Sequence, residues 1–181
     1  RNKGDAEAAL EQAASTVERD YYVPHLLHTP MEPPAATARV VDGGLEVWAC
    51  TQNPQTATTS AAKAAGVKPE DVVVHVTFLG GAFGRKSKGD FVAEAAFLAK
   101  ATGQPVRVQW TREDDVRHDY FNAVSMQRFT AGLNESGEVT AWRHRTAFPP
   151  IASTFSRRRL RSRIRTWSVM SRIPPRRSVT S

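Results

Sequence analysis

The alternation of apolar and polar residues is clearest between residues 72 and 101. A run of β-branched residues over 72–78 predicts a strand. Three glycines then interrupt the pattern: Gly80, Gly81 and Gly84. Apolar residues resume at helical spacing on one expected buried stripe: Phe91, Ala95 and Leu98. The stretch therefore predicts a strand, a glycine turn and a helix that ends near Ala101.

The residues before this stretch predict a helix, a strand and a hairpin. Alanines at helical spacing indicate a short helix within 4–17, and alternation over 16–23 indicates a strand. Segments 37–41 and 45–49 flank Asp42-Gly43-Gly44, a typical hairpin turn. We then expect a helix from Pro54 to about Ala65, capped by Asn53.

The pattern after the central helix predicts further strands. Residues 106–110 indicate one strand, and the densely charged segment 111–122 is interpreted as a surface loop. Segments 123–133 and 139–148 alternate over a longer distance and are joined by Asn134-Glu135-Ser136-Gly137, which predicts a second hairpin. The whole pattern indicates an α+β fold of mixed sheets, β-hairpins and packed helices.

The net charge of the chain is concentrated at its C-terminal end. The 181 residues carry a formal charge of +7, and 40% of them are hydrophobic, which is enough for a core. Residues 156–181 hold nine arginines and no acidic residue, so residues 1–155 carry sixteen basic against eighteen acidic side chains, a charge of −2. We therefore expect no nucleic-acid partner for the body of the protein.

Three interpretations of the tail 156–181 remain open. It is a basic tail that binds nucleic acid, a disordered tail without function, or the product of a shifted reading frame near codon 156. We favour the third, because arginine rises abruptly at this point. Resequencing this junction decides between them, and an intact frame would end the frame-shift hypothesis.

Cysteine usage and hydropathy narrow the class of protein further. A single cysteine, Cys50, excludes an internal disulfide and is interpreted as a small buried residue. The chain begins at Arg1 rather than Met and has no apolar run long enough for a signal or a membrane span. We therefore expect a truncated N-terminus, and the sequence assigns no compartment.

The glycine turn is the main candidate site. Backbone amides at such a turn, the positive end of the following helix and the side chains of Arg85 and Lys86 would face an anion such as a phosphate. The spacing is neither the dinucleotide fingerprint nor a Walker loop. Glycines at such a bend also serve close packing alone, so a structural turn is the alternative. The large apolar Phe83 within the turn favours a site where it packs over a ligand.

Two other positions along the chain are weaker candidates for a functional site. His25, His28 and Glu32 lie in one proline-rich loop, but their irregular spacing fixes no geometry, so we assign no metal ligand there. His118 has the chemistry of a general base but no visible partner, and we interpret it as a surface residue.

Three segments in order carry a resemblance to a known family. They are WACTQNPQT at 48–56, LGGAFGRK at 79–86 and DFVAEAAFLAKATGQPVRVQWTREDD at 90–115. Together they resemble the molybdenum-binding large subunit of the xanthine oxidase family of molybdenum hydroxylases. The branch of isoquinoline 1-oxidoreductase β subunits and aldehyde oxidoreductases is the most similar. The resemblance extends over about Gly4 to Phe155, so we treat 1–155 as a fragment of a larger molybdopterin-binding domain.

The resemblance implies a cofactor, partners and site residues. It implies molybdopterin with molybdenum, as the cytosine dinucleotide, an iron–sulfur small subunit that accepts electrons, and an N-heteroaromatic or aldehyde substrate oxidised with oxygen from water. At the matching positions, Gln52 would hydrogen-bond an oxygen on molybdenum. The pterin and its phosphates would be bound by the remaining residues: Gly80, Gly81, Ala82, Phe83, Gly84 and Arg85.

The chain also departs from the family pattern. The glutamate that acts as the general base in this family has no matching position here, so no catalytic residue is assigned. Purine-oxidising members place a glutamate where this chain has Ser87, which disfavours a purine substrate. The alternatives are a non-catalytic phosphate or nucleotide-binding module, and a nucleic-acid binder that uses its basic tail. The fragment alone is expected to be inactive.

Overall fold

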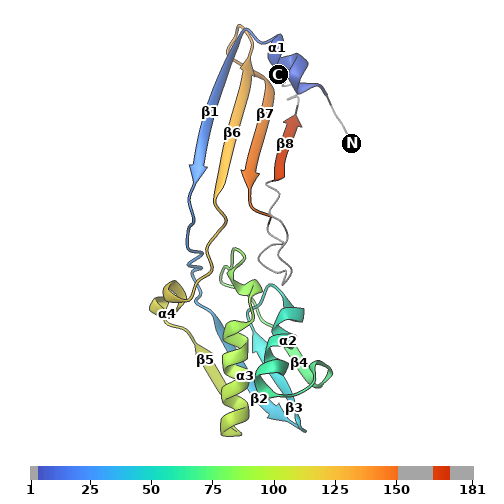
Figure 1. Ribbon diagram of the computed structural model, residues 1–181, viewed down its shortest axis with the longest axis vertical. Coiled ribbons are helices and arrows are strands. Elements are labelled where there is room, and N and C mark those ends of the chain that lie inside the picture. The colour runs from blue at the N-terminus through green and yellow to red at the C-terminus, as the bar shows by residue number, and fades with distance from the viewer. Residues whose placement is uncertain (1–3, 151–164, 172–181) are drawn as a thin grey trace, which may run out of the picture. The chain divides into compact units, whose positions relative to one another are not determined.

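The protein consists of two compact units (Figure 1). The computed structural model describes residues 4–150 and 165–171. One unit runs from Leu27 to Asn122, and the other combines the chain before Leu27 with the chain from Ala123 onward. Treating residues 1–155 as one fragment did not anticipate this division.

The unit formed by the two ends of the chain is an antiparallel sheet with one helix. Its strands lie in the order β1 (Ser15–Val23), β6 (Ser125–Leu133), β7 (Val139–Phe148) and β8 (Arg165–Ser171). Helix α1 (Ala6–Glu11) lies against β7 and β6, and the Asp5 side chain caps it. The predicted hairpin of β6 and β7 is confirmed, because the two strands pair antiparallel.

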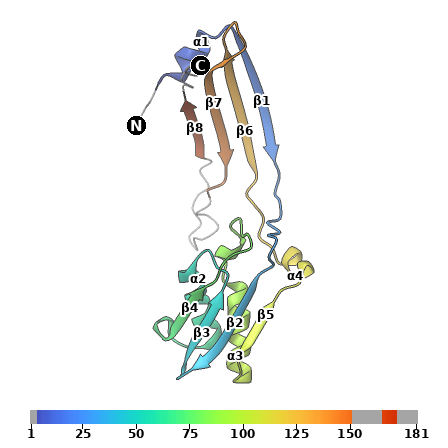
Figure 2. The ribbon, with the colours of Figure 1, turned by 180° about the vertical axis from the view of Figure 1, so that it is seen from behind.

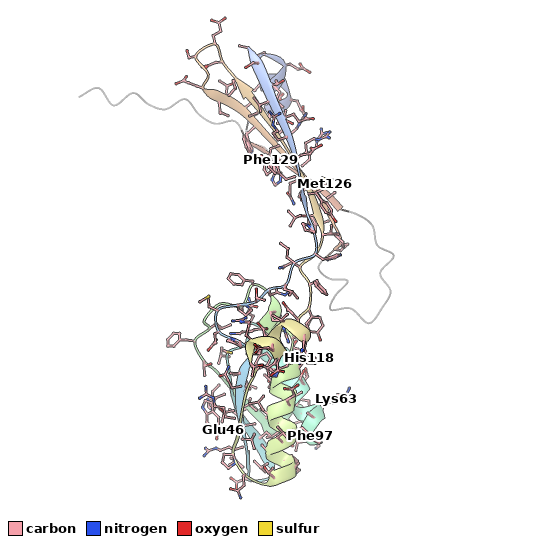
Figure 3. The ribbon with its side chains drawn as sticks, turned by 90° about the vertical axis from the view of Figure 1, so that its left-hand side faces the viewer. Glu46, Lys63, Phe97, His118, Met126 and Phe129 are labelled. Atoms are coloured by element: carbon pink, nitrogen blue, oxygen red, sulfur yellow. The ribbon has the colours of Figure 1, made fainter. Side chains whose placement is uncertain are left out.

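The two faces of this sheet differ in chemistry. On one face, Arg128 donates to both carboxylate oxygens of Asp20 at 2.7 and 2.6 Å. On the other face, Phe129 stacks on His144 with ring centroids 4.2 Å apart and meets Tyr21 edge-on at 5.8 Å (Figure 3). Alternate residues of each strand therefore form a charged surface and an aromatic surface.

The unit of residues 27–122 has a mixed sheet with helices on one face (Figures 1 and 2). The strand order is β4 (Val72–Val76), β3 (Gly44–Ala49), β2 (Ala35–Val41) and β5 (Val106–Gln109). Strands β3 and β4 are parallel, and the other neighbours are antiparallel. Helices α2 (Pro54–Ala65) and α3 (Asp90–Thr102) cover the sheet, and the turn η1 (Pro69–Asp71) precedes β4. The α+β class and the hairpin of β2 and β3 are confirmed.

The core of this unit is built mainly from small residues. Ala38 and Val47 of the sheet are fully buried beneath α3 and α2. The buried stripe of α3 differs from the prediction, because Leu98 is 41% exposed and its neighbour Phe97 is 58% exposed (Figure 3). Phe91 and Ala95 are buried as predicted, and the other buried residues of the helix are Val92, Ala96 and Ala99. Alanines face α2 because they allow the two helices to approach closely.

The interpretation of 111–122 as a surface loop was wrong. Residues Arg112–Arg117 form helix α4, and Thr111 and Asp114 cap its first turn reciprocally. Asp115 is completely buried and pairs with Arg112 at 2.5 Å. We took high charge as a sign of solvent exposure, but here acidic side chains cap a helix and meet buried cations.

Most of the arginine-rich tail lies outside the described residues, and its three proposed origins stay open. Of residues 156–181, the structure describes 165–171, which form β8 and pair with β7. No helix in the described part of the chain is long and apolar enough to span a membrane.

Candidate functional site

The glycine loop, defined as residues 80–84, follows β4 on the chain. Left-handed backbone angles recur along it: φ is +90° at Gly81, +54° at Phe83 and +105° at Gly84. At Gly81 and Gly84 these angles favour glycine, whereas Phe83 adopts a conformation that is uncommon for a residue with a Cβ. Phe83 is 70% exposed, so most of its ring is open to a ligand.

The loop does not open directly into the helix as we expected. The turn η2 (Arg85–Ser87) intervenes, and α3 begins only at Asp90 with Gly89 as its N-cap. The positive end of α3 therefore does not lie within the glycine loop. Any anion held by the loop would depend on the loop's own amides.

Three consecutive amides in the glycine loop lack a protein acceptor. The amide of Gly80 donates to Glu32 Oε2 at 2.9 Å, and that of Gly84 donates to Gln52 Oε1 at 2.9 Å. Between them, the amides of Gly81, Ala82 and Phe83 donate to no group within residues 4–150 and 165–171. Backbone donors are rarely left unpaired, and successive amides in left-handed turns form anion-binding concavities.

Gln52 is brought to this loop from 32 positions earlier in the sequence. Strands β3 and β4 are parallel, so their carboxyl ends meet at one edge of the sheet. The backbone amide of Gln52 and the hydroxyl of Thr51 both donate to the carbonyl of Lys86, at 3.0 and 3.1 Å. The structure thus places Gln52 next to the glycine loop, as the resemblance implied.

Arg85 points into the protein rather than toward a ligand. Its side chain has no exposed surface and donates to both carboxylate oxygens of Asp90, at 3.1 and 2.8 Å. Its Nε lies 3.3 Å from Asp119 Oδ1, and the guanidinium sits over the rings of Trp110 and Tyr120, at 5.1 and 5.2 Å from their centroids. We expected this guanidinium to face a phosphate, and the structure pairs it instead with the partly exposed carboxylate of Asp90 and the buried carboxylate of Asp119.

Lys86 is also buried and holds the opposite side of the loop. Its Nζ lies 2.6 Å from Glu32 Oε2, the oxygen that also accepts from the Gly80 amide. Burial acts to raise the pKa of Glu32, but the hydrogen bonds from Lys86 and Gly80 outweigh it and hold the pKa below its ordinary value. A side chain at Gly80 would place its Cβ 2.6 Å from Glu32 Cβ, so the contact requires glycine.

His28 and Asp119 form a third buried pair at this site. The backbone amide of His28 donates to Asp119 Oδ2 at 2.5 Å, and His28 Nδ1 lies 3.0 Å from Oδ1. Their side chains are 8% and 0% exposed. The weak metal candidate His25, His28 and Glu32 is therefore divided, with His28 on Asp119 and Glu32 on Lys86.

A second buried carboxylate lies on the neighbouring helix α4. Burial raises the pKa of Asp115, an effect opposed by the Arg112 cation and reinforced by Asp119. Arg112 also donates to the carbonyls of Pro30 and Met31, at 2.6 and 3.1 Å. Helix α4 thereby fixes the proline-rich segment that carries His28 and Glu32.

The sequence pattern missed the acidic partners at this site. Asp119 is 91 positions from His28, and no local spacing links them. The available signal was the number of acidic residues in 111–122 opposite the basic pair Arg85 and Lys86. His118, by contrast, is exposed as predicted, and its Nδ1 lies 3.0 Å from the carbonyl of Asp114.

Successive backbone amides in such a turn, beside Gln52, are typical of the class of proteins that bind a polar or anionic ligand there. Comparison with known families identifies the class: residues 1–149 match the model of the molybdopterin cofactor-binding domain. The chain belongs to this family. The resemblance to molybdenum hydroxylases of the xanthine oxidase family is thereby confirmed.

Similar proteins include components of several oxidoreductases. A nicotinate dehydrogenase chain of Pseudomonas putida is 29% identical over 148 residues, which cover 82% of this chain and 12% of the relative. The beta chain of isoquinoline 1-oxidoreductase from Brevundimonas diminuta is 34% identical over 120 residues, covering 65% of this chain and 15% of the relative.

A solved structure shows the same fold. The aldehyde oxidoreductase of Desulfovibrio gigas superposes with a TM-score of 0.53 and 25% sequence identity, covering 75% of this chain and 15% of that one. The chain therefore spans a small part of the length of each of these relatives.

Proposed function

We propose that this chain is part of the molybdenum-binding subunit of a molybdenum hydroxylase and that its glycine loop binds molybdopterin. The observation that carries the proposal is the run of three amides without an acceptor, next to Gln52, in a chain of this family. The predicted cofactor residues divide into three groups. The first group supplies backbone amides to the ligand and consists of Gly81, Ala82 and Phe83. The second group shapes the loop through hydrogen bonds and consists of Gly80, Gly84 and Gln52. The third is Arg85, which anchors the loop through its ion pair with Asp90.

The residues of the loop fit such a ligand. Molybdopterin carries phosphate oxygens and a pterin ring edge, and both accept hydrogen bonds from amides. Gly81 has a φ of +90°, which favours glycine, whereas a Cβ there would make only ordinary contacts with Phe83 and Pro30 at 3.5 and 3.6 Å. Gln52 offers an amide side chain that both donates and accepts.

The cofactor, once bound, would supply the redox chemistry and the oxygen activation of the reaction. The residues of this chain bind and orient it. Ion pairs of the buried cations Arg85 and Lys86 hold the loop in place before a ligand arrives, which lowers the entropy lost on binding. No catalytic base is assigned in this chain.

The names of the relatives support the proposed substrate class, and the partner subunit is proposed from the family resemblance. Their names indicate oxidation of a nicotinate, an isoquinoline or an aldehyde. An N-heteroaromatic or aldehyde substrate, oxygen from water and electron transfer to an iron–sulfur subunit are accordingly part of the proposal. So is the cytosine dinucleotide form of the cofactor. Ser87 stands where a purine-oxidising enzyme has a glutamate, which disfavours purines.

Cofactor content tests the proposal. The subunit that carries these residues is expressed with its partner subunits, and molybdenum and released pterin are measured per protein molecule. We expect near-stoichiometric cofactor in the wild type. In Gln52→Leu we expect cofactor release about ten-fold faster, as for loss of one strong hydrogen bond. A purified wild-type complex that holds neither molybdenum nor pterin would overturn the proposal.

A matched control is Gln55→Leu, because Gln55 is an exposed glutamine in the first turn of α2. It should retain wild-type cofactor content.

The free amides also favour one alternative, a phosphate or nucleotide-binding module without molybdenum. That alternative predicts that a free nucleotide binds the purified chain in calorimetry. Under our proposal, a free nucleotide does not bind at micromolar concentration.

A further inference from the structure

One imidazole nitrogen beside the glycine loop has no protein partner. The His28 side chain is only 8% exposed, and its Nδ1 is engaged by Asp119. In the described part of the chain, His28 Nε2 forms no hydrogen bond. Nε2 is not one of the fully buried atoms without a partner in the described part of the chain, so it is accessible to a ligand.

Asp119 determines which ring nitrogen of His28 is engaged by the protein and which one can contact another group. Its two carboxylate oxygens contact the backbone amide and Nδ1 of His28, and Arg85 Nε lies 3.3 Å away. A carboxylate only accepts hydrogen bonds, so the network assigns a proton to Nδ1. The ring is thereby fixed in orientation, and Nε2 remains for another group.

Nε2 faces the glycine loop. It lies 3.6 Å from the position that a Cβ on Gly84 would occupy. Gly84 is the residue whose amide donates to Gln52, and it directly follows the three amides without acceptors. Because Gly84 has no side chain, the space in front of Nε2 is not filled by the loop itself. Three loop amides and the neighbouring His28 Nε2 therefore all lack a hydrogen-bond partner among the described residues.

We propose that His28 is a further ligand-contacting residue of this site. Its Nε2 hydrogen-bonds a polar group of the molybdopterin held by the glycine loop, and Asp119 acts as the residue that positions it. The inference rests on the proposed function and deepens it. It assigns a role to the segment around His28, for which the sequence pattern offered only a weak metal hypothesis.

Two substitutions of His28 by amide residues distinguish a contact between Nε2 and the ligand from the structural role of the bond to Asp119. In His28→Asn, the amide nitrogen takes about the place of Nδ1, so the bond to Asp119 is kept and the group at Nε2 is lost. In His28→Gln, an amide reaches about the place of Nε2, while the bond to Asp119 is lost. His75→Asn is the matched control, because His75 is a half-exposed histidine on β4 that pairs with Glu46.

The assembled subunit and its partners are used for each variant. The measurements are the rate at which pterin is released on dilution and the unfolding midpoint of the cofactor-free protein. We expect release about ten-fold faster in His28→Asn, within about three-fold of wild type in His28→Gln, and unchanged in His75→Asn. The cofactor-free His28→Asn protein should unfold close to the wild-type midpoint.

Three results would overturn the inference. Release from His28→Asn at the wild-type rate would show that Nε2 makes no contact. Equal acceleration in both variants, or faster release from the glutamine variant, would show that only the support of Asp119 matters. A wild-type complex without any pterin would remove the proposed function as well, which distinguishes the two failures.

Discussion

At the scale of single residues, one ion pair of the site joins a buried cation to a partly exposed carboxylate. Lys86 has no exposed surface, whereas the side chain of its partner Glu32 is 37% exposed. Removing the carboxylate leaves an ammonium buried without a partner, but removing the ammonium leaves a carboxylate that water reaches. The two halves of one ion pair should therefore not be equivalent.

This asymmetry gives a stability prediction. Glu32→Gln should lower the free energy of unfolding by about 3 kcal/mol, while Lys86→Met, of similar shape and apolar, should cost about 1 kcal/mol or less. The double variant should be more stable than Glu32→Gln alone. Urea unfolding followed by tryptophan fluorescence measures all three, and equal losses in the two single variants would contradict the argument.

The same pair predicts how stability depends on pH. The pKa of Glu32 is lower in the folded protein than its ordinary value of 4.5. The folded state therefore favours the ionised carboxylate, so the pair stabilises the protein above this value, and the contribution is lost as the pH falls through the folded pKa. The stability difference between wild type and Glu32→Gln should shrink steadily as the pH is lowered from about 6 to about 3. A stability difference that does not change with pH would contradict this prediction.

Residue-level sequence reasoning succeeded where chemistry is local. Asn53 caps α2 as predicted, with its side chain accepting from the Thr56 amide at 3.1 Å, because a cap involves residues three positions apart. It failed for Arg85, which the pattern directed toward a ligand. The partners of Arg85 include Asp119, which only the folded chain brings near. Burial of a charge is set by distant residues and leaves no mark in local spacing.

At the scale of elements, the close approach of α2 and α3 depends on Gly89. Its φ of −100° is accessible to other residues, so the backbone does not demand glycine. The neighbouring helix α2 does demand glycine, because a Cβ at position 89 would lie 2.7 Å from Ser60 Cβ and 3.1 Å from the carbonyl of Thr56. This contact places η2, and hence Arg85 and Lys86, against the core.

Gly89→Ala should consequently destabilise the protein by about 2 kcal/mol through overpacking. Adding Ser60→Gly removes the two closest atoms, Ser60 Oγ and Cβ, and leaves the Thr56 carbonyl at 3.1 Å. The double variant should be more stable than the sum of the two single effects, and a double-mutant cycle in urea measures this coupling. Additive effects would indicate that the helices separate without cost, contrary to the observed packing.

Elements with strong local signals were predicted well, and those defined by tertiary contacts were not. The hairpin at Asp42-Gly43 and the helix stop at Gly66 follow from residues that favour positive φ, which the structure confirms. Helix α4 was missed, although Thr111 and Asp114 stand at capping-box spacing, because charge was taken to mean exposure. The buried stripe of α3 was predicted correctly at Phe91 and Ala95 but not at its last position, because Leu98 is exposed and Ala99 is buried, which hydrophobicity alone does not predict.

At the scale of the whole molecule, the described apolar core belongs to one unit. The core cluster runs from Ala36 to Trp110, all within residues 27–122. In the other unit, every residue of β1 is exposed or only partly buried, and Ala6 and Ala141 are the buried apolar residues among those described. Uneven core formation of this kind could not be deduced from the sequence, where both halves show equally regular strands.

The chain of residues 27–122 should therefore fold by itself. It has the length of an ordinary domain and contains the core, the glycine loop, Gln52 and the three pairs Arg85–Asp90, Lys86–Glu32 and His28–Asp119. We expect cooperative urea unfolding with a free energy of about 5 kcal/mol, reported by Trp48 and Trp110. The Glu32→Gln variant of this shorter chain should lose as much stability as it does in the full chain, because the partners of Glu32 lie inside the unit. A gradual, non-cooperative transition would show that the sheet of β1, β6 and β7 is needed to hold the site together.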